Sequence, residues 1–231
     1  MENLLVFHFY CFCIKIVNTV DKITFDTSKT KLIIFDFDGV IVDSLEHTYV
    51  GNLRAWPNLS LDQHRDFFNG NFYEEVQKLP APVYPLEEHF KWFIGTHESK
   101  KKYLPIFPEM EKVIKKLAEK YKLTINTSAD LASTNDCLQH NNIDLFTSVY
   151  AVEISKDKVR KFQKILSDFK VEVNECVFIT DTVGDVKEAS KLSVPTILVS
   201  WGYHDKSHFA ELKEDVISIV DKPLDLLDLL S

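Results

Sequence analysis

Four aspartates in two short segments are the residues of this 231-residue chain best suited to chemistry. Asp36 and Asp38 are separated by one residue, and Asp181 and Asp185 are separated by three. Carboxylates that gather in one site repel each other and raise each other's pKa unless a cation neutralises them. Oxygen ligands of this kind suit Mg²⁺, which uses few carboxylates and keeps several waters. The four aspartates therefore predict a magnesium site, provided that the fold brings the two segments together.

Each pair of aspartates follows a run of apolar residues that has the length of a β-strand. Residues 31–35 run into Asp36, and residues 176–179 run toward Asp181. Short apolar runs rich in β-branched residues are typical of strands buried on both faces of a parallel sheet. In such sheets ligands bind beyond the carboxyl ends of the strands, so we expect both pairs to lie at the same edge.

A third apolar run, over residues 123–126, ends at Thr127 and Ser128 and adds two hydroxyl groups to the expected site. Strands and amphipathic helices alternate through this part of the chain, which predicts βαβ units with helices on both faces of the sheet. The expected fold is therefore α/β, with a doubly wound parallel sheet. The other elements that we expect are strands over 148–152 and 196–199 and helices over 109–120, 129–140, 158–169 and 185–192.

Residues 44–104 interrupt this alternation with aromatic residues at helical spacing and with prolines. We interpret them as several short helices without strands, whose aromatic side chains form the core of that segment. The expected organisation is a core made of residues 31–43 and 105–231, with the helical segment inserted between them. The two crossings, near 43–44 and 104–105, are expected to act as hinges.

Residues 1–30 form an extension whose role the sequence leaves open. Residues 4–17 are strongly apolar but shorter than the ~20 residues of a membrane-spanning helix. They lack the basic stretch and the small-residue cleavage site of a signal peptide. We interpret them as an extra strand or helix packed on the core, with a membrane-anchored or artefactual extension as the alternative, followed by a polar connector.

Composition excludes several classes of protein. Hydrophobic residues make up 45% of the chain, enough for a full core without disulfides or a structural metal. The net charge of −8 argues against non-specific binding of nucleic acid, which needs a basic surface. The four cysteines form no CxxC pair, which favours free thiols in a reducing compartment and a cytoplasmic location. We expect neither a nucleic-acid nor a membrane partner, and the oligomeric state cannot be deduced from the sequence.

Several segments together resemble the haloacid dehalogenase (HAD) superfamily of hydrolases. Residues 35–40, FDFDGV, resemble its first motif, and residues 125–127, INT, resemble its second motif. Residues 178–185, FITDTVGD, resemble its fourth motif. Residues 201–203, WGY, are similar to a late segment of its phosphoglycolate phosphatase-like branch. Motifs in this order and spacing, each after an expected strand, imply a HAD-like Rossmannoid core, with a small helical cap inserted after the first motif at residues 44–104.

The resemblance implies a magnesium-dependent phosphatase, a phosphoric monoester hydrolase acting on a small phosphorylated metabolite. Asp36 would be the nucleophile that forms an aspartyl-phosphate, and Asp38 would be the general acid and base. Thr127, with Ser128 as its competitor, would bind the substrate phosphate.

The third motif of the superfamily is a lysine near the start of a helix. Lys156 and Lys158 both stand at a suitable separation from the fourth motif, and we favour Lys158 because it leads directly into the expected helix. This lysine would neutralise the nucleophile and the transferred phosphoryl group. The residues that would hold Mg²⁺ are the carboxylates of Asp36 and Asp181, the main-chain carbonyl of Asp38 and, through water or from the surroundings, Asp185.

Other activities on the same fold remain open. A haloacid dehalogenase lacks the acid two residues after the nucleophile, so Asp38 favours phosphoryl chemistry. A phosphonatase needs a Schiff-base lysine from the cap, for which Lys78, Lys91 and residues 100–102 are unassigned candidates. A sugar phosphomutase shares all the motifs, and an inactive binding protein would differ only in turnover. The substrate itself cannot be deduced, because cap residues carry no transferable signature.

Overall fold

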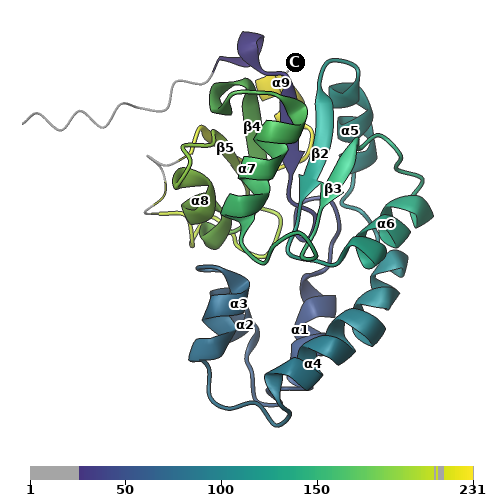
Figure 1. Ribbon diagram of the computed structural model, residues 1–231, viewed down its shortest axis with the longest axis vertical. Helices are drawn as coiled ribbons and strands as arrows, with labels where there is room; N and C mark the ends of the chain where they lie inside the picture. Colours follow the sequence, from purple (N-terminus) through teal and green to yellow (C-terminus); the bar gives the residue numbers. More distant parts are fainter. Residues whose placement is uncertain (1–25, 211, 213–215, 231) are drawn as a thin grey trace, which may run out of the picture.

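The computed structural model of the protein describes residues 26–210, 212 and 216–230. Within these residues, six strands form one sheet in the order β3–β2–β1–β4–β5–β6, and neighbouring strands are parallel (Figure 1). The α/β fold with a doubly wound parallel sheet is therefore confirmed. Most of the expected N-terminal extension, residues 1–25, lies outside the described residues. The strands are β1 (Leu32–Phe35), β2 (Lys122–Asn126), β3 (Ser148–Tyr150), β4 (Cys176–Thr180), β5 (Thr196–Val199) and β6 (Ser218–Val220).

The helices of the core follow the strands in the expected alternation. The helices are α5 (Met110–Ala118), α6 (Leu131–His140), α7 (Lys158–Phe169), α8 (Val183–Ser190) and α9 (Asp225–Leu230), with 3-10 turns at Thr27–Lys29 and Val173–Glu175. The first four lie over the ranges that the sequence predicts, whereas β6 and α9 have no counterpart among the expected elements. Within the described part of the chain, no helix is both long and apolar enough to cross a membrane.

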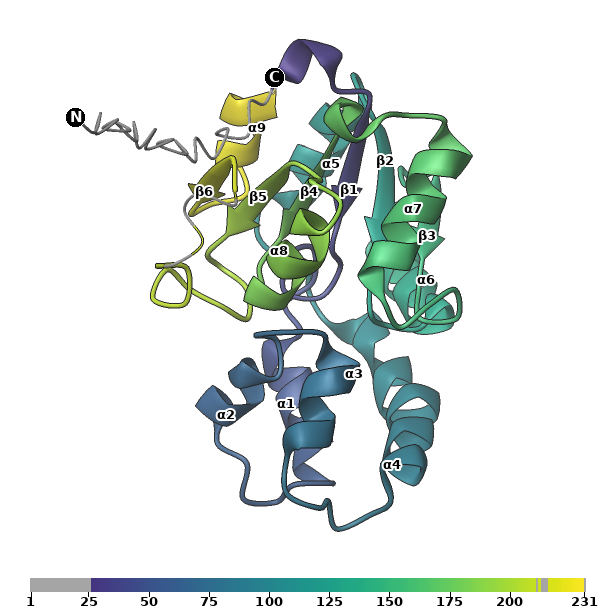
Figure 2. The same ribbon diagram turned by 60° about the vertical axis from the view of Figure 1, so that its left-hand side comes forward.

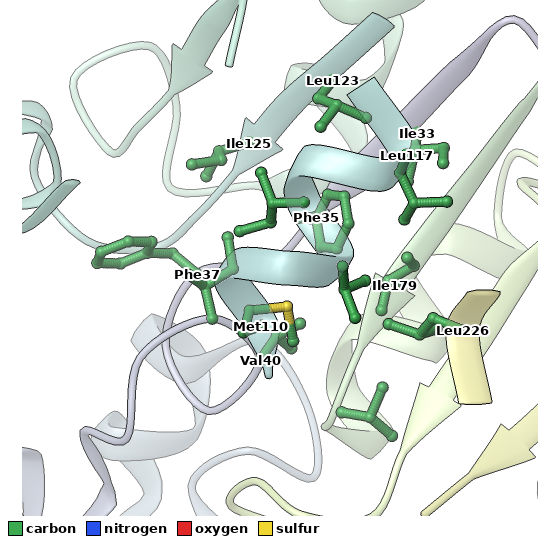
Figure 3. Close-up of a cluster of buried hydrophobic side chains, with 14 of the residues drawn as sticks. Ile33, Phe35, Phe37, Val40, Met110, Leu117, Leu123, Ile125, Ile179 and Leu226 are labelled. Atoms are coloured by element: carbon green, nitrogen blue, oxygen red, sulfur yellow. The ribbon is translucent and has the colours of Figure 1, made fainter. Parts of the chain in front are cut away.

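β1 lies at the centre of the sheet, between β2 and β4, and its residues point alternately to the two faces. Ile33 and Phe35 pack on the face covered by α5, α6 and α9 (Figure 3). Leu32 and Ile34 pack on the opposite face, where α7 and α8 supply the neighbouring side chains. Because helices cover both faces, the whole strand is buried, which explains its continuous apolar sequence.

Residues 44–104, which we call the helical segment, lie beyond the carboxyl ends of the strands (Figure 2). The structure describes all of these residues and shows no strand among them, as the sequence predicts. Trp56 and Phe67 belong to a small apolar core of the segment itself. Its elements are α1 (Leu45–Leu53), α2 (Leu61–Asp66), α3 (Phe72–Glu75), α4 (Leu86–Trp92), a π-helical turn (Phe93–His97) and 3-10 turns at Val76–Lys78 and Glu98–Tyr103.

The chain leaves the core and returns to it through two adjacent stretches, residues 41–43 and 105–107, which we call the stem. The main-chain N–H of Asp43 donates to the carbonyl of Pro105 over 3.1 Å, and a second main-chain hydrogen bond joins the other end of the stem over 2.9 Å. An antiparallel bridge joins the middle residues of the two stretches. The chain therefore enters and leaves the helical segment at one place.

Candidate active site

Asp36 follows the last residue of β1 and lies almost fully inside the protein, with 6% of its surface exposed. Its main-chain N–H continues the sheet by donating to the carbonyl of Ile179 over 2.8 Å. One carboxylate oxygen accepts a hydrogen bond from the N–H of Phe37 at 2.8 Å, and the other lies 2.9 Å from Nζ of Lys158. Burial raises the pKa of the Asp36 carboxyl well above its ordinary value, and the Lys158 ammonium opposes that rise.

Lys158 is the first residue of α7, and the Asp157 side chain caps this helix by accepting from the N–H of Val159 at 2.7 Å. Nζ of Lys158 is buried between Asp36 and Asp185, at 2.9 and 2.6 Å. Burial alone would lower the pKa of this ammonium, but the two carboxylates raise it above its ordinary value. The structure therefore brings Lys158 into the site as a cation.

Lys156, the competing candidate for the third motif, points elsewhere. Its side chain is exposed, and its ammonium lies 4.9 Å from the centre of the Tyr73 ring. Of the two lysines, only Lys158 contacts the aspartate that follows β1.

Asp185 lies in the first turn of α8, which Thr182 caps. One oxygen of its carboxylate accepts from both Lys158 Nζ and Thr180 Oγ1, each at 2.6 Å. Burial would raise the pKa of Asp185, but Lys158 and these hydrogen bonds hold it below its ordinary value. The carboxylate thus holds the Lys158 ammonium in position.

Asp181 follows β4 and is completely buried. Its Oδ2 accepts from the N–H of Tyr203 at 2.6 Å, whereas its Oδ1 has no hydrogen-bond partner. Burial raises the pKa of this carboxyl to about 7. Gly39, whose φ is 75°, and Gly202 both lie against it, and a Cβ atom at either would approach Oδ2 to 2.1–2.2 Å. The two glycines therefore leave room for a buried carboxylate whose second oxygen is free to bind a ligand.

Thr127 and Ser128 follow β2 and line the same cavity as Asp36, Asp38 and Lys158. Thr127 is fully buried, and its Oγ1 accepts from the N–H of Ala129 at 3.0 Å, which leaves its own O–H free to donate into the cavity. It is not the cap of α6, because the Asp130 side chain fills that position. The cavity has a volume of about 90 Å³.

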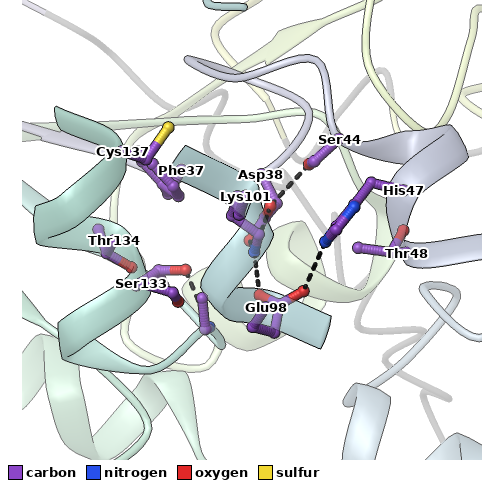
Figure 4. A network of polar contacts seen from close by, with 12 residues as sticks. Phe37, Asp38, Ser44, His47, Thr48, Glu98, Lys101, Ser133, Thr134 and Cys137 are labelled. Carbon is purple, nitrogen blue, oxygen red and sulfur yellow. Dashed lines mark hydrogen bonds and ion pairs between the residues drawn. The ribbon is translucent and has the colours of Figure 1, made fainter. Parts of the chain in front are cut away.

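Asp38 takes part in a buried polar network that the sequence did not reveal (Figure 4). Its carboxylate accepts from Ser44 Oγ at 2.6 Å and pairs with Nζ of Lys101 at 2.8 Å. Lys101 also pairs with Glu98, three residues earlier on the same 3-10 turn, and only 1% of its side chain is exposed. Burial raises the pKa of Glu98 to about 7, although Lys101 opposes this. Lys101 is the middle one of three consecutive lysines, and nothing in the sequence distinguishes it from its neighbours.

The helical segment also contacts the core through direct hydrogen bonds made by residues that line the cavity. The main-chain N–H of Gly184, in the first turn of α8, donates to the carbonyl of Phe68 over 2.8 Å. The Tyr73 hydroxyl donates to the carbonyl of Ser128 over 2.9 Å. These contacts place side chains of the helical segment opposite Asp36.

The sequence of the chain matches a known family. The chain belongs to the haloacid dehalogenase-like hydrolase family, whose sequence model matches residues 33–199. The membership predicted from the motifs is therefore confirmed. No curated protein matches the chain.

Solved structures share the fold over most of their length. A haloacid dehalogenase-like family hydrolase from Streptococcus pneumoniae aligns with a TM-score of 0.76 at 19% identity, covering 88% of this chain and 100% of that one. A predicted phosphoglycolate phosphatase from Haemophilus somnus aligns with a TM-score of 0.67 at 18% identity, covering 88% of this chain and 99% of that one. CbbY from Rhodobacter sphaeroides, solved in complex with phosphate, aligns with a TM-score of 0.70 at 13% identity, covering 85% of this chain and 96% of that one. At these identities the similarity concerns the fold.

Proposed function

We propose that the protein is a magnesium-dependent phosphatase, a phosphoric monoester hydrolase, that acts on a small phosphorylated metabolite through an aspartyl-phosphate. One observation carries the proposal: Asp36 and Asp38, after the central strand, share a cavity with Thr127 and Lys158. Membership of a hydrolase family supports it, as does the similarity of the fold to a predicted phosphoglycolate phosphatase.

In the proposed reaction, a carboxylate oxygen of Asp36 attacks phosphorus, and the bond from phosphorus to the ester oxygen breaks. Asp38 gives a proton to the leaving alcohol and then takes one from the water that hydrolyses the aspartyl-phosphate. Inorganic phosphate and the alcohol are the products. The ammonium of Lys158, 2.9 Å from Asp36, favours the ionised form of the nucleophile and offsets charge on the transferred group. Thr127, with Ser128 beside it, would donate to a phosphoryl oxygen.

The residues at the carboxyl ends of β1 and β4 fit a bound Mg²⁺. Asp181 has a buried oxygen without a hydrogen-bond partner, and its charge lies close enough to Asp36 to contribute to the raised pKa of the Asp36 carboxyl. Within the described residues, no three His, Cys, Asp or Glu side chains gather as a metal-binding group. The main-chain carbonyl of Asp38 and waters would therefore complete the ligand set, with Asp185 outside it. The ion would stabilise negative charge on the phosphoryl oxygens.

Removal of divalent metal is expected to abolish activity. We expect the protein to release phosphate from p-nitrophenyl phosphate and from some member of a panel of phosphorylated metabolites, provided that Mg²⁺ is present. EDTA should stop the release, and added Mg²⁺ should restore it. Ca²⁺ should inhibit, because it prefers more ligands and a looser geometry. Full activity in excess EDTA, with the metal content of the protein measured as nil, would contradict the proposal.

The surroundings of Lys101 argue against the phosphonatase alternative. This lysine is the one cap candidate among the described residues that lines the cavity, but Asp38 and Glu98 hold its ammonium. The two carboxylates raise the pKa of Lys101 above its ordinary value even though it is buried, so its amine is not free to form a Schiff base. A sugar phosphomutase would be distinguished by its product, because it returns a phosphorylated sugar rather than free phosphate.

We further propose that the helical segment is a cap that opens on the stem and closes over the cavity. Closure would exclude water and place the segment's residues on the substrate. The core, residues 31–43 and 105–231, would then carry the chemistry, while the cap, residues 44–104, would admit the substrate. The hydrogen bond between Gly184 and Phe68 supports closure, since it joins the core to a residue of the segment that lines the cavity.

Gly184→Ala is expected to impair closure while leaving the core folded. A Cβ atom at this position would lie 2.2 Å from the main-chain oxygen of Gly70, which cannot move without shifting α3. Alanine is a better helix former than glycine by about 1 kcal/mol, so the melting temperature should not fall. We expect KM to rise on the order of tenfold, about 1.4 kcal/mol of substrate binding. Gly95→Ala is the matched control, because a Cβ atom there meets nothing within 4 Å. Equal kinetics for the two variants would contradict cap closure.

A further inference from the structure

The part of the helical segment that lines the cavity with Asp36, which we call the wall, is rich in apolar side chains. The sequence suggested that the segment's aromatic residues form its own core, but the structure divides them. Trp56 and Phe67 are buried inside the segment, whereas others line the cavity. The apolar residues of the wall are Phe68, Phe72, Phe90, Phe93 and Ile94.

The uncharged polar groups in this wall already have partners within the protein. Asn52 uses its amide nitrogen on His64 at 3.2 Å and its amide oxygen on His89 at 3.1 Å. The hydroxyl of Tyr73, also in the wall, donates to a core carbonyl. The Thr48 hydroxyl bonds to a carbonyl of its own helix and to the Tyr203 hydroxyl. A substrate hydroxyl would therefore have to share each of these groups with a partner that the group already has within the protein.

The charged groups that the segment contributes to the wall pair with each other, although Oε1 of Glu98 has no hydrogen-bond partner. Lys101 lies between two carboxylates, Glu98 on the segment and Asp38 on the core. Among the described residues that line the cavity, the segment supplies no other cation. A carboxylate or second phosphate on the substrate's leaving group would therefore find no unpaired positive charge on this side.

From these contacts we infer, on the basis of the phosphatase function proposed above, that the substrate is a phosphate monoester of an apolar alcohol. The phosphate would lie at Asp36, Thr127 and Lys158, and the alkyl or aryl group would lie against the phenylalanine wall. Burying such a group is favourable in proportion to its apolar area. A sugar or a carboxylate in the same place would lose more hydrogen bonds to water than this side of the cavity replaces, which disfavours it.

The test compares phosphate esters of primary alcohols, whose intrinsic reactivities are similar, with the full chain in Mg²⁺. n-Butyl and benzyl phosphate represent apolar alcohols, and glycerol 3-phosphate and 2-phosphoglycolate represent polar ones. We expect kcat/KM to be higher for the apolar pair by about 30-fold or more, within the range by which an apolar pocket distinguishes ligands. Phosphate release is measured in each case, so all four esters also report on the proposed function.

Phe93→Asn introduces a polar side chain into the wall and should lower the preference for apolar esters about tenfold, mainly through KM. Ile94→Asn is a second variant at a wall residue that is 36% exposed, where folding is less at risk. The matched control is Tyr84→Asn, at an aromatic residue of the same segment that is 40% exposed and does not line the cavity. The control should keep the preference of the native chain.

The outcomes separate the inference from the function on which it rests. Hydrolysis of all four esters with a preference for the polar pair, or with no preference, would overturn the inference and leave the phosphatase function intact. Hydrolysis of none of them, with p-nitrophenyl phosphate also untouched, would overturn both. If Tyr84→Asn reduces the preference for apolar esters as much as Phe93→Asn does, the wall is not the source of that preference. This result would also overturn the inference.

Discussion

Replacement of Asp36 by asparagine is expected to lower turnover by about 10⁴-fold or more, the scale seen when a catalytic nucleophile is removed. The amide is nearly the same size as the carboxylate, and its oxygen can still accept from the N–H of Phe37. It cannot attack phosphorus to form an acyl phosphate. The substrate should still bind, so the loss should appear in kcat rather than in KM. A phosphate-release assay in Mg²⁺ measures both parameters.

The same substitution should leave the fold as stable as before, or more stable. Burial raises the pKa of the Asp36 carboxyl, so at neutral pH the ionised form is less favourable in the folded protein than in the unfolded chain. A neutral amide removes that cost, while Lys158 keeps Asp185 as a partner at 2.6 Å. The melting temperature of the variant is the control. Native-like turnover in a folded Asp36→Asn protein would show that another residue is the nucleophile.

Lys158→Met is expected to damage activity and stability together. The ammonium neutralises two buried carboxylates, Asp36 and Asp185, and its loss leaves both without this partner. Removing one partner of a buried ion pair typically lowers the free energy of unfolding by about 3–5 kcal/mol. For a chain of this length that corresponds to a fall in melting temperature of at least about 6 °C. We expect kcat to fall by about 10²–10³, as when one donor that stabilises the transition state is removed.

Lys156→Met is the matched control, two residues away and of the same chemistry. Its ammonium is exposed and contacts only the face of Tyr73 at 4.9 Å among the described aromatic rings. Such surface substitutions usually change stability by less than about 0.5 kcal/mol. A variant at Lys156 that loses as much kcat as the variant at Lys158 would reverse the assignment of the third motif. Thermal melts and steady-state kinetics on the two variants decide the matter.

The sequence predicted the core well because its elements carry local patterns. β1 is covered by helices on both faces, so its residues had to be apolar without interruption, and the aspartate after it had to fall at the edge of the sheet. The same reasoning located Thr127 after β2 and Asp181 after β4. The choice between Lys156 and Lys158 rested on where α7 begins, and the helix does begin at Lys158.

The parts that sequence reasoning missed depend on contacts between distant segments. Lys101 is buried only because its 3-10 turn packs against α6 and directs the ammonium at Asp38. The division of the aromatic residues between an internal core and a cavity wall follows from how the helical segment sits on the core. β6 and α9 have only three and six residues. Such short elements cannot show the repeating pattern of apolar residues by which a strand or a helix is recognised in a sequence.

The stem has a consequence for how such a protein can change in evolution. Its two stretches are hydrogen-bonded side by side, so the ends of any inserted chain are already held together by the core. Doubling the length of such a loop costs only about 0.6 kcal/mol of closure entropy. Insertions of different length or shape could therefore replace one another at this point without disturbing Asp36 on its central strand. The residues at the edge of the sheet can then be inherited unchanged while the inserted segment is exchanged as a separate unit.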